Sequence, residues 1–436
     1  MTAPERRSLV CAALALALAV LWQFFDVRYN YGGHWTGLFC IGGKLPLPPA
    51  LATRDLYRLP LSDGYDGQFY YYVSHDPFLQ GEFLQYVDNS PLRWRRILLP
   101  ALAYLVAWGR ADFIAPAYVA IVLASVFAGS WWFSRLCQIA SFSPFWGLGF
   151  LIVPAVAISL DRMTVDSLLA ALCMAFAYYG VHQASWKIYP VLLLAPLVRE
   201  TGLVLPVAFA LFCLFQKKFR EAALGTAMVI PWLGWMLFVQ FKLWVDATPW
   251  LTAIPLSGLV ARTFEPVQFE IKGPWLALAA FLDYLALLGL WCAILLAARI
   301  ILKKDLGLLE LATAIFAGSA IFVAKPDVWA DAYAFARTMS PMLIWLALLA
   351  ISKRSLELLV PLALSIPRIA LQIGTMSTSF PPGLMQDAAV LVGLSVRVPV
   401  WLMLCGALPV SESLGRRVGD PSQVTKSEKR TVRRLD

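Results

Sequence analysis

Long, uninterrupted apolar blocks alternate along the chain with short polar segments. Most blocks hold about 15 to 25 residues, the length that an α-helix needs to cross roughly 30 Å of hydrocarbon. A membrane β-barrel would instead alternate apolar and polar residues, but these blocks are continuous and rich in Leu and Ala. The pattern predicts an all-α polytopic membrane protein with about twelve spans (about 10 to 13). The blocks lie at residues 9–25, 111–134, 146–160, 165–181, 188–198, 202–216, 221–241, 275–298, 307–324, 335–351, 356–373 and 387–409.

The positions of Lys and Arg predict the orientation of these spans. Arg6 and Arg7 precede the first block, which is either a signal peptide or, because it is long for one, a membrane anchor. We favour the anchor, which places the N-terminus in the cytoplasm, residues 26–110 in a first external loop and residues 242–274 in a second. The second loop is a candidate lid. The basic residues that then fall on the cytoplasmic side are Arg135, Lys187, Lys217, Lys218, Arg220, Arg299, Lys303, Lys304, Lys353, Arg354, Arg416 and Arg417.

Three short apolar segments determine this threading. Residues 97–108 would form a helix of only about 18 Å, so we expect an interfacial helix there rather than a span. Residues 188–198 and 202–216 are also short, and basic residues flank the outer end of each. We therefore expect a hairpin with Arg199-Glu200-Thr201-Gly202 at its external tip.

Composition narrows the class of protein further. Apolar residues make up 60% of the chain and charged residues 14%, against about 25% charged in soluble domains, so a water-soluble globule is excluded. The net charge is +9, but because the basic residues gather at block ends and in the tail, we expect membrane lipids and no nucleic acid as partners. We predict one transmembrane domain over residues 1–409 and a disordered, basic cytoplasmic tail over residues 410–436.

Metal and disulfide chemistry find no support in the sequence. The seven cysteines form no C-x-x-C pair, and the three histidines (His34, His75 and His182) share no helical metal-ligand spacing. We expect neither a metal site nor a cofactor.

The first external loop concentrates polar and aromatic residues near the membrane surface. It contains the segment G-Y-D-G-Q-F-Y-Y-Y-V-S-H-D-P from Gly64 to Pro77. Asp66 stands between Gly64 and Gly67, which permit a sharp turn or a close approach to a substrate. One interpretation is that Asp66 caps a helix beginning at Gly67, with the tyrosines as an interfacial belt. The other is that Asp66 is a general base beside aromatic rings suited to stacking on sugars. The ring-bearing residues are Tyr65, Phe69, Tyr70, Tyr71 and Tyr72.

Other charged residues near the external ends of the blocks can also be interpreted in two ways. Arg93, Arg95 and Arg96 either reach lipid head groups or contact a donor phosphate. Arg199 and Glu200 are either a paired intramembrane charge or a functional site, which is the default for ionisable residues at membrane depth. The remaining candidates are Asp161 and Asp166, which either cap the fourth span or bind an acceptor, and His75, which we expect mainly to end a short helix before Pro77.

This layout resembles the GT-C superfamily of polyprenyl-phosphate-sugar glycosyltransferases. An N-terminal span, an external loop with Tyr65-Asp66-Gly67-Gln68-Phe69-Tyr70 and an Arg-rich entry to the next helix are similar to bacterial cell-surface glycopolymer proteins. The likeness to the mannosyltransferases of GPI-anchor assembly is looser. The resemblance as a whole covers roughly residues 1–220. It implies a second acidic position at Asp161 or Asp166, a phosphate-binding hairpin tip at Arg199, and a further arginine at Arg337, which heads the tenth span.

The resemblance implies sugar transfer from a lipid-linked donor to a glycan, lipid or protein acceptor on the external face of a bacterial inner membrane. Because a phosphate leaves as an anion, one base and several cations suffice, without a metal. Asp66 would be the base, with its pKa raised by partial burial. Arg199, Arg337, Arg95 and Arg96 would bind the donor phosphate. The residues assigned to the sugar or the acceptor are Tyr65, Gln68, Tyr70, His75, Asp161, Asp166 and Glu200.

Two other functions fit the same sequence. A lipid-linked glycan flippase or other transporter would distribute its charged residues along a path through the helices. A non-catalytic subunit of a glycopolymer assembly system would not need Asp66.

Overall fold

A computed structural model describes residues 2–181, 186–243, 254–265, 274–303, 306–323 and 326–377. The structure is 79% helical, which confirms the predicted mostly helical architecture. Within the described ranges the only strands are β1 (Ile41–Gly42) and β2 (Arg58–Leu59), which pair in parallel.

Six described helices are long and apolar enough to cross a membrane, or seven spans if one bent pair is counted. They are α1 (Ala3–Asn30), α6 (Ala111–Ile139), the joined pair α11 (Phe219–Ala227) and α12 (Ile230–Leu243), α14 (Pro274–Leu302), α17 (Ala332–Lys353) and α18 (Val360–Met376). The bent pair is η3 (Pro144–Ile152) and α7 (Pro154–Arg162), which meet at 61°. These helices agree with a multi-pass membrane protein.

The expected twelve spans are not confirmed. Four apolar helices in the described ranges are too short to count as spans by themselves, namely α8 (Asp166–Val181), α9 (Ile188–Val198), α10 (Val204–Phe215) and α15 (Leu308–Ala320). The 11 residues of α9, for example, extend only about 16 Å at 1.5 Å per residue. The block at 387–409 and the tail at 410–436 lie outside the described residues.

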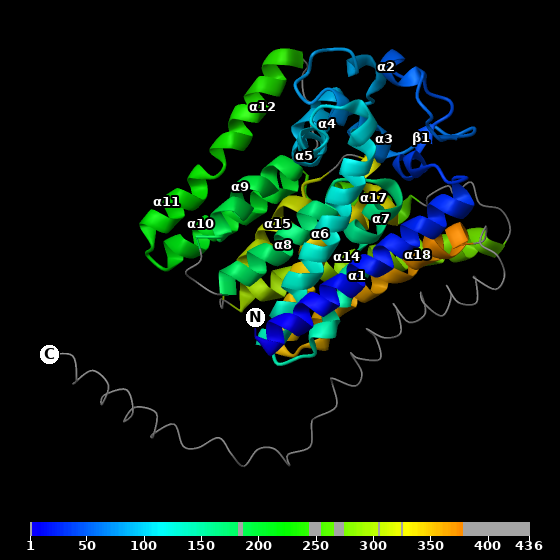
Figure 1. Ribbon diagram of the computed structural model, residues 1–436. Coiled ribbons are helices and arrows are strands. Elements are labelled where there is room, and N and C mark those ends of the chain that lie inside the picture. The colour runs from blue at the N-terminus through cyan, green and yellow to red at the C-terminus, as the bar shows by residue number, and fades with distance from the viewer. Residues whose placement is uncertain are drawn as a thin grey trace, which may run out of the picture.

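Short elements of the first loop cover one end of the helical bundle, which we call the loop end (Figure 1). The chain passes through η1 (Trp35–Phe39), α2 (Pro49–Ala52), α3 (Asp66–His75), η2 (Leu84–Tyr86), α4 (Ser90–Arg95) and α5 (Leu98–Val106). The nine residues of α5 are too few to cross a bilayer, as expected for an interfacial helix. The expected hairpin tip is η4 (Glu200–Leu203), between α9 and α10.

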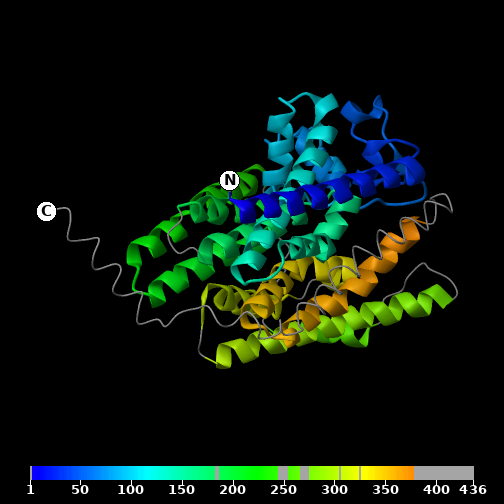
Figure 2. The same cartoon turned by 60° about the horizontal axis from the view of Figure 1, so that its bottom comes forward.

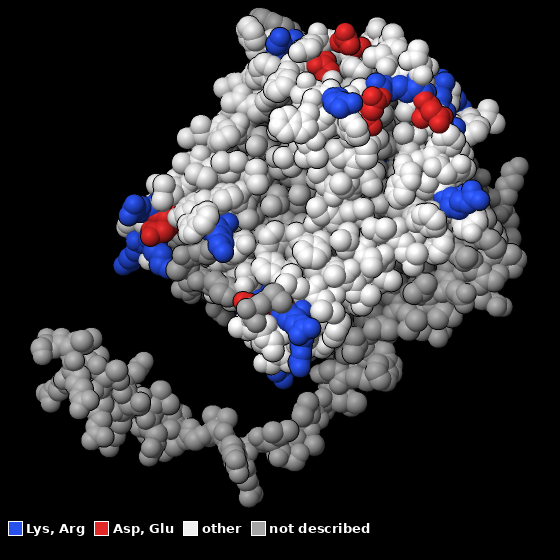
Figure 3. All heavy atoms as spheres, in the orientation of Figure 1, with Lys and Arg blue, Asp and Glu red and all other residues white. Residues whose placement is uncertain are grey.

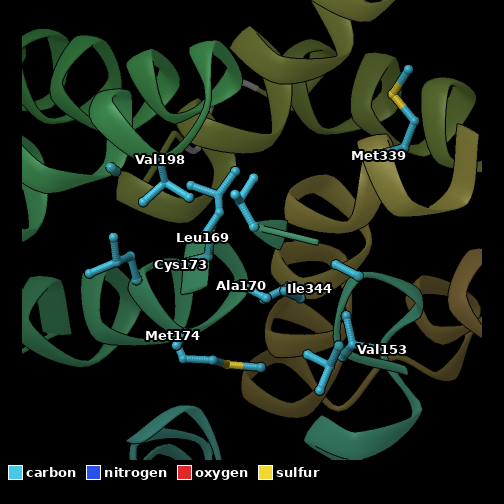
Figure 4. Packing of buried hydrophobic residues seen from close by; sticks show 14 of the residues in the cluster. Val153, Leu169, Ala170, Cys173, Met174, Val198, Met339 and Ile344 are labelled. Carbon is cyan, nitrogen blue, oxygen red and sulfur yellow. The ribbon is translucent and has the colours of Figure 1, made fainter. Parts of the chain in front are cut away.

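The bundle is built around α17. In its most apolar stretch 89% of the residues are buried, whereas the corresponding value for α11 and α12 is 17%. Figure 2 shows α14 and α18 side by side along one flank. Figure 4 shows part of the core, in which Ala170 of α8 lies beside Ile344 of α17. The remaining short helices are α13 (Ser257–Phe264), α16 (Pro326–Trp329) and η5 (Leu356–Leu359).

Surface charges gather at the two ends of the bundle on the face drawn in Figure 3, and the broad band between them carries few charges. Such a band is expected where helices meet hydrocarbon, because a charged side chain there would lose its hydration. On this face, the loop end is one of the two regions where charged side chains gather.

Candidate active site

The N-terminus of α3 places Asp66 at the loop end. The turn before it uses Gly64 with a φ of 84°, a conformation that glycine adopts without strain. Gly67 packs against the end of α7, where an added methyl group would clash with the carbonyl oxygen of Arg162. Tyr65 occupies the N-cap position and makes no side-chain cap. Glycine at these positions thus allows the first turn of α3 to sit directly against the bundle.

Both carboxylate oxygens of Asp66 are held by arginines. Arg93 Nη2 donates to Oδ1 at 2.7 Å, and Arg337 Nη2 donates to Oδ2 at 2.6 Å. Both of these arginine residues are buried, whereas the Asp66 side chain is 22% exposed. The interpretation of Asp66 as a helix cap is therefore wrong, because its carboxylate is engaged by side chains from α4 and α17 instead of backbone N–H groups.

These two arginines determine the protonation state of Asp66. Burial by itself raises the pKa of the carboxyl group, but the adjacent guanidinium groups of Arg93 and Arg337 outweigh it and hold the pKa well below its usual range. The expectation that burial raises this pKa is wrong for the structure described here. In this arrangement Asp66 is ionised and paired, and it is a weak base.

Two further buried arginines face the same space. Arg96 follows α4 and donates from Nε to Glu200 Oε2 at 3.0 Å and from Nη1 to the Tyr70 hydroxyl at 3.0 Å. Arg199 follows α9, and its Nη2 donates to Thr338 Oγ1 at 2.8 Å. Segments distant in sequence thus deliver four guanidinium groups to one place.

Asp166 connects two of these arginines deep in the site. Its carboxylate is ion-paired with Arg199, and its Oδ2 lies 3.6 Å from Arg337 Nε. The side chains of Asp166 and Arg199 are each 4% exposed. Removal of the Asp166 charge would leave the guanidinium of Arg199 buried without its carboxylate, which is far more costly than the net contribution of the pair.

A cavity of about 250 Å³ opens among these residues, somewhat below the usual volume of small-molecule sites. Its lining combines charged and polar residues with three apolar ones, Leu92, Val328 and Ala334. The lining residues are Asp66, Asp88, Asn89, Leu92, Arg93, Arg96, Arg199, Val328, Ala334, Arg337 and Thr338.

Several arginine N–H groups at the cavity have no hydrogen-bond partner. They are Nη1 and Nε of Arg337 and Nε of Arg199. Buried donors are normally satisfied. Because Arg337 Nε faces Asp166 Oδ2 at 3.6 Å, Arg337 Nη1 and Arg199 Nε are the two groups whose missing partner an oxygen-rich ligand would supply. The planar guanidinium suits phosphate or carboxylate oxygens bound in pairs.

Four of the predicted site residues lie away from the cavity. Arg95 points to α12, where its Nη2 contacts Gln240 Oε1 at 3.4 Å. His75 packs between the rings of Tyr71 and Phe83, at 4.8 and 5.6 Å. The other two residues make structural contacts: Gln68 binds Gly42 N and the Asp63 carbonyl, and Asp161 accepts a hydrogen bond from Trp22 Nε1.

Tyrosines of the loop motif flank the cavity without lining it. The ring of Tyr65 lies 4.4 Å from the guanidinium carbon of Arg162 and 5.4 Å from that of Arg337. Tyr70 accepts the hydrogen bond from Arg96 and lies 5.1 Å from the Arg93 guanidinium. Their rings therefore support the arginines, and no direct contact with a sugar is needed to explain them.

Two cavity residues that bond to its arginines, Asp88 and Thr338, are not predicted from the sequence, and Arg93 is given two interpretations there without a role in the site. The Asp88 carboxylate accepts hydrogen bonds from Arg93 Nε at 2.9 Å and from Arg93 Nη2 at 2.8 Å. Helical spacing could have distinguished the arginines that line the cavity from Arg95. Positions 93 and 96 are three residues apart and share a helix face, whereas position 95 lies on another face. Nothing local in the sequence marks Asp88 or Thr338.

The second predicted external loop contributes a separate ion pair. Arg262 of α13 binds Asp283 of α14, and Asp283 also accepts the N–H of Ala332 at 2.8 Å. The pair holds the start of α17, the helix that carries Arg337. Trp244, Asp246, Trp250 and Glu270, which belong to the candidate lid, lie outside the described residues.

No group of metal-ligating side chains occurs among the residues that the structure describes. In comparisons with protein families, curated proteins and solved structures, nothing matches the chain. The function must therefore be argued from the cavity.

Proposed function

We propose that the chain is a membrane glycosyltransferase of the GT-C type. It would transfer a sugar from a polyprenyl-phosphate donor to a hydroxyl group of a cell-envelope glycan, lipid or protein. The observation that carries the proposal is the juxtaposition of one partly exposed carboxylate, Asp66, with four buried arginines in a single cavity at the loop end of the bundle.

The reaction needs three groups at one point. Arg337 and Arg199 would bind the phosphate of the donor through their unpartnered N–H groups. The acceptor O–H bond breaks as its proton moves to Asp66, and its oxygen forms the new bond to the anomeric carbon. The bond from that carbon to the phosphate oxygen breaks, and the electron pair stays on the phosphate, which the arginines stabilise. Direct displacement inverts the anomeric configuration, and no acid is needed for the leaving group.

The distribution of buried charge favours an enzyme over a transporter. In the described part of the chain, buried charged residues lie in the loop-end half of the bundle, except Glu310, which pairs with Lys353 near the opposite end at 2.6 Å. A transport path would be expected to place polar groups near the midplane and on both halves. The others are Asp26, Asp76, Arg93, Arg96, Asp161, Asp166, Arg199, Arg262, Asp283, Arg337 and Arg368.

The test is sugar transfer by the purified protein from polyprenyl-phosphate hexoses to a mixed envelope acceptor fraction. Asp66→Asn should lower the rate by about 10² to 10⁴ because the base is lost. Asp63→Asn is the matched control, since Asp63 stands three residues earlier and its exposed side chain pairs with Lys44 at 3.8 Å, away from the cavity lining. Equal transfer by the folded Asp66→Asn protein and the parent would refute the catalytic assignment.

We also propose that the loop end faces the outside of a bacterial inner membrane. A cysteine introduced at the exposed Glu82 should react with an impermeant reagent in intact cells. Labelling only after lysis would show that the orientation is the reverse.

A further inference from the structure

Asp66 sits where an anionic ligand would bind. Its Oδ2 accepts a hydrogen bond from Nη2 of Arg337, and the Nη1 group of the same guanidinium has no partner. A phosphate that bound Arg337 with two oxygens would use both terminal nitrogens. It would therefore compete directly with Asp66.

The arginines that hold Asp66 each have another carboxylate. Arg93 is bound side-on by Asp88, through Nε at 2.9 Å and Nη2 at 2.8 Å. Arg337 lies 3.6 Å from the buried Asp166. If Asp66 were displaced, both guanidinium groups would keep their positions, because Asp88 and Asp166 would still hold them.

The charge balance of the cavity also favours displacement of a carboxylate when a phosphate binds. The four arginines Arg93, Arg96, Arg199 and Arg337 face four carboxylates, Asp66, Asp88, Asp166 and Glu200. An added phosphate would leave uncompensated negative charge in a partly buried cavity, which is unfavourable unless a carboxylate moves away or takes up a proton.

Asp66 is the carboxylate best placed to leave. Asp166 is 4% exposed and does not line the cavity, whereas the Asp66 side chain lines it and is 22% exposed. Asp88 also lines the cavity and is 41% exposed, but its hydrogen bonds come from Arg93 and not from Arg337, the guanidinium whose Nη1 group is unused.

We propose that the phosphate of the donor displaces Asp66 from Arg93 and Arg337, so that donor binding itself frees the catalytic base. This inference rests on the proposed function and adds an order to it, in which the donor binds before the acceptor loses its proton. Until the donor arrives, Asp66 stays paired and inactive.

Displacement would also strengthen the base. The two guanidinium groups hold the pKa of Asp66 well below its usual range against the opposing effect of burial. Once they are taken by phosphate, the carboxylate loses its partners and gains an anionic neighbour, and both changes favour proton uptake. The proton that it takes is the one released by the acceptor hydroxyl.

Binding of an alkyl phosphate tests the exchange without any catalysis. Dodecyl phosphate and inorganic phosphate are titrated by calorimetry into the parent protein and into Asp66→Asn in nanodiscs. Removal of the competing carboxylate should tighten binding by about tenfold or more, since close charge pairs couple strongly. Tightening with dodecyl phosphate alone indicates a lipid head group as ligand, and tightening with both probes indicates that phosphate suffices.

Asp88→Asn is the charge-matched control, because it removes one negative charge from the same cavity and one partner of Arg93 but leaves Asp66 on Arg337. Because Asp66 still occupies Arg337 in this variant, the gain in affinity for dodecyl phosphate should be smaller than in Asp66→Asn. If both variants bind phosphate more tightly by the same factor, the gain comes from the net charge of the cavity alone, and the exchange is overturned. Unchanged or weaker binding by Asp66→Asn would also overturn it.

A measurement on the parent protein covers the case in which Asp66→Asn does not fold. Infrared difference spectra on addition of dodecyl phosphate should show a shift in a carboxylate band as Asp66 leaves its two arginines, and Asp88→Asn should retain it. An unchanged carboxylate band would overturn the exchange. If the parent transfers sugar but phosphate does not displace Asp66, the exchange fails and the proposed function stands. If phosphate displaces Asp66 but no sugar is transferred, the exchange stands and the proposed function fails.

Discussion

Replacement of Arg337 by lysine separates the geometry of its guanidinium group from its charge. In the structure Arg337 reaches Asp66 at 2.6 Å and Asp166 at 3.6 Å, and its Nη1 group is unused. Lysine keeps one positive charge, but it offers a single ammonium group where arginine offers a planar fork. Arg337→Lys should therefore weaken the donor complex while leaving the charge of the cavity unchanged.

The magnitude follows from the contacts that lysine cannot reproduce. A phosphate held by both terminal nitrogens of Arg337 would lose one charge-assisted hydrogen bond, which contributes about 1.5 to 3 kcal/mol. That corresponds to about a 10- to 100-fold weaker donor affinity. Because Asp66 loses the same fork, its own pairing is also weaker, and the lower end of the range is the better expectation.

The assay measures the initial rate of sugar transfer against donor concentration and, separately, the binding of dodecyl phosphate. Arg162→Lys is the matched control, because Arg162 stacks on the same Tyr65 ring, at 4.4 Å, but does not line the cavity. Equal effects of Arg337→Lys and Arg162→Lys on donor affinity would refute the argument, since the loss would then come from the support of Tyr65.

Three further predictions concern stability, measured by thermal or chemical unfolding in detergent. Asp166→Asn should destabilise the protein by about 3 to 5 kcal/mol, because it leaves the Arg199 charge buried without its partner; an unchanged transition would contradict this. Burial lowers the pKa of His75 to about 4, so the unfolded state binds the additional proton. Stability from the neutral ring, present above about pH 6.5, should fall toward pH 4 in the parent and less in His75→Phe. Gly67→Ala should cost about 1 to 3 kcal/mol through its clash with α7, whereas Gly234→Ala, with open space around it, should be neutral or stabilising.

The helical architecture could be predicted from the sequence because hydrocarbon imposes a minimum length on apolar helices. Ile97 to Trp108 was expected outside the membrane on this ground, and α5 is a nine-residue helix there. The number of spans could not be derived in the same way. The sequence indicated the short blocks 188–198 and 202–216, but α9 and α10 are too short to count as spans by themselves.

For the candidate site, the sequence indicated the residues but not their contacts with one another. Asp66, Arg199 and Arg337 could be selected because charges near the ends of apolar blocks are costly without a role. Their mutual contacts could not, because α3, η4 and α17 meet only in the folded bundle. The direction of the Asp66 pKa was wrong for this reason: burial was visible in the pattern of the loop, but the Arg93 partner that outweighs burial was not.

The balance of charge at the cavity bears on why the ion pairs are there at all. Buried ion pairs contribute little to stability compared with well-packed apolar residues, so stability alone does not explain them. Four uncompensated arginines would disfavour the unliganded fold, and a cavity with no cations would not hold a phosphate. A set of carboxylates, one of which can move, meets both conditions. Asp66 is the member of that set that lines the cavity, contacts Arg337 and leaves both of its arginines held by other residues when it departs.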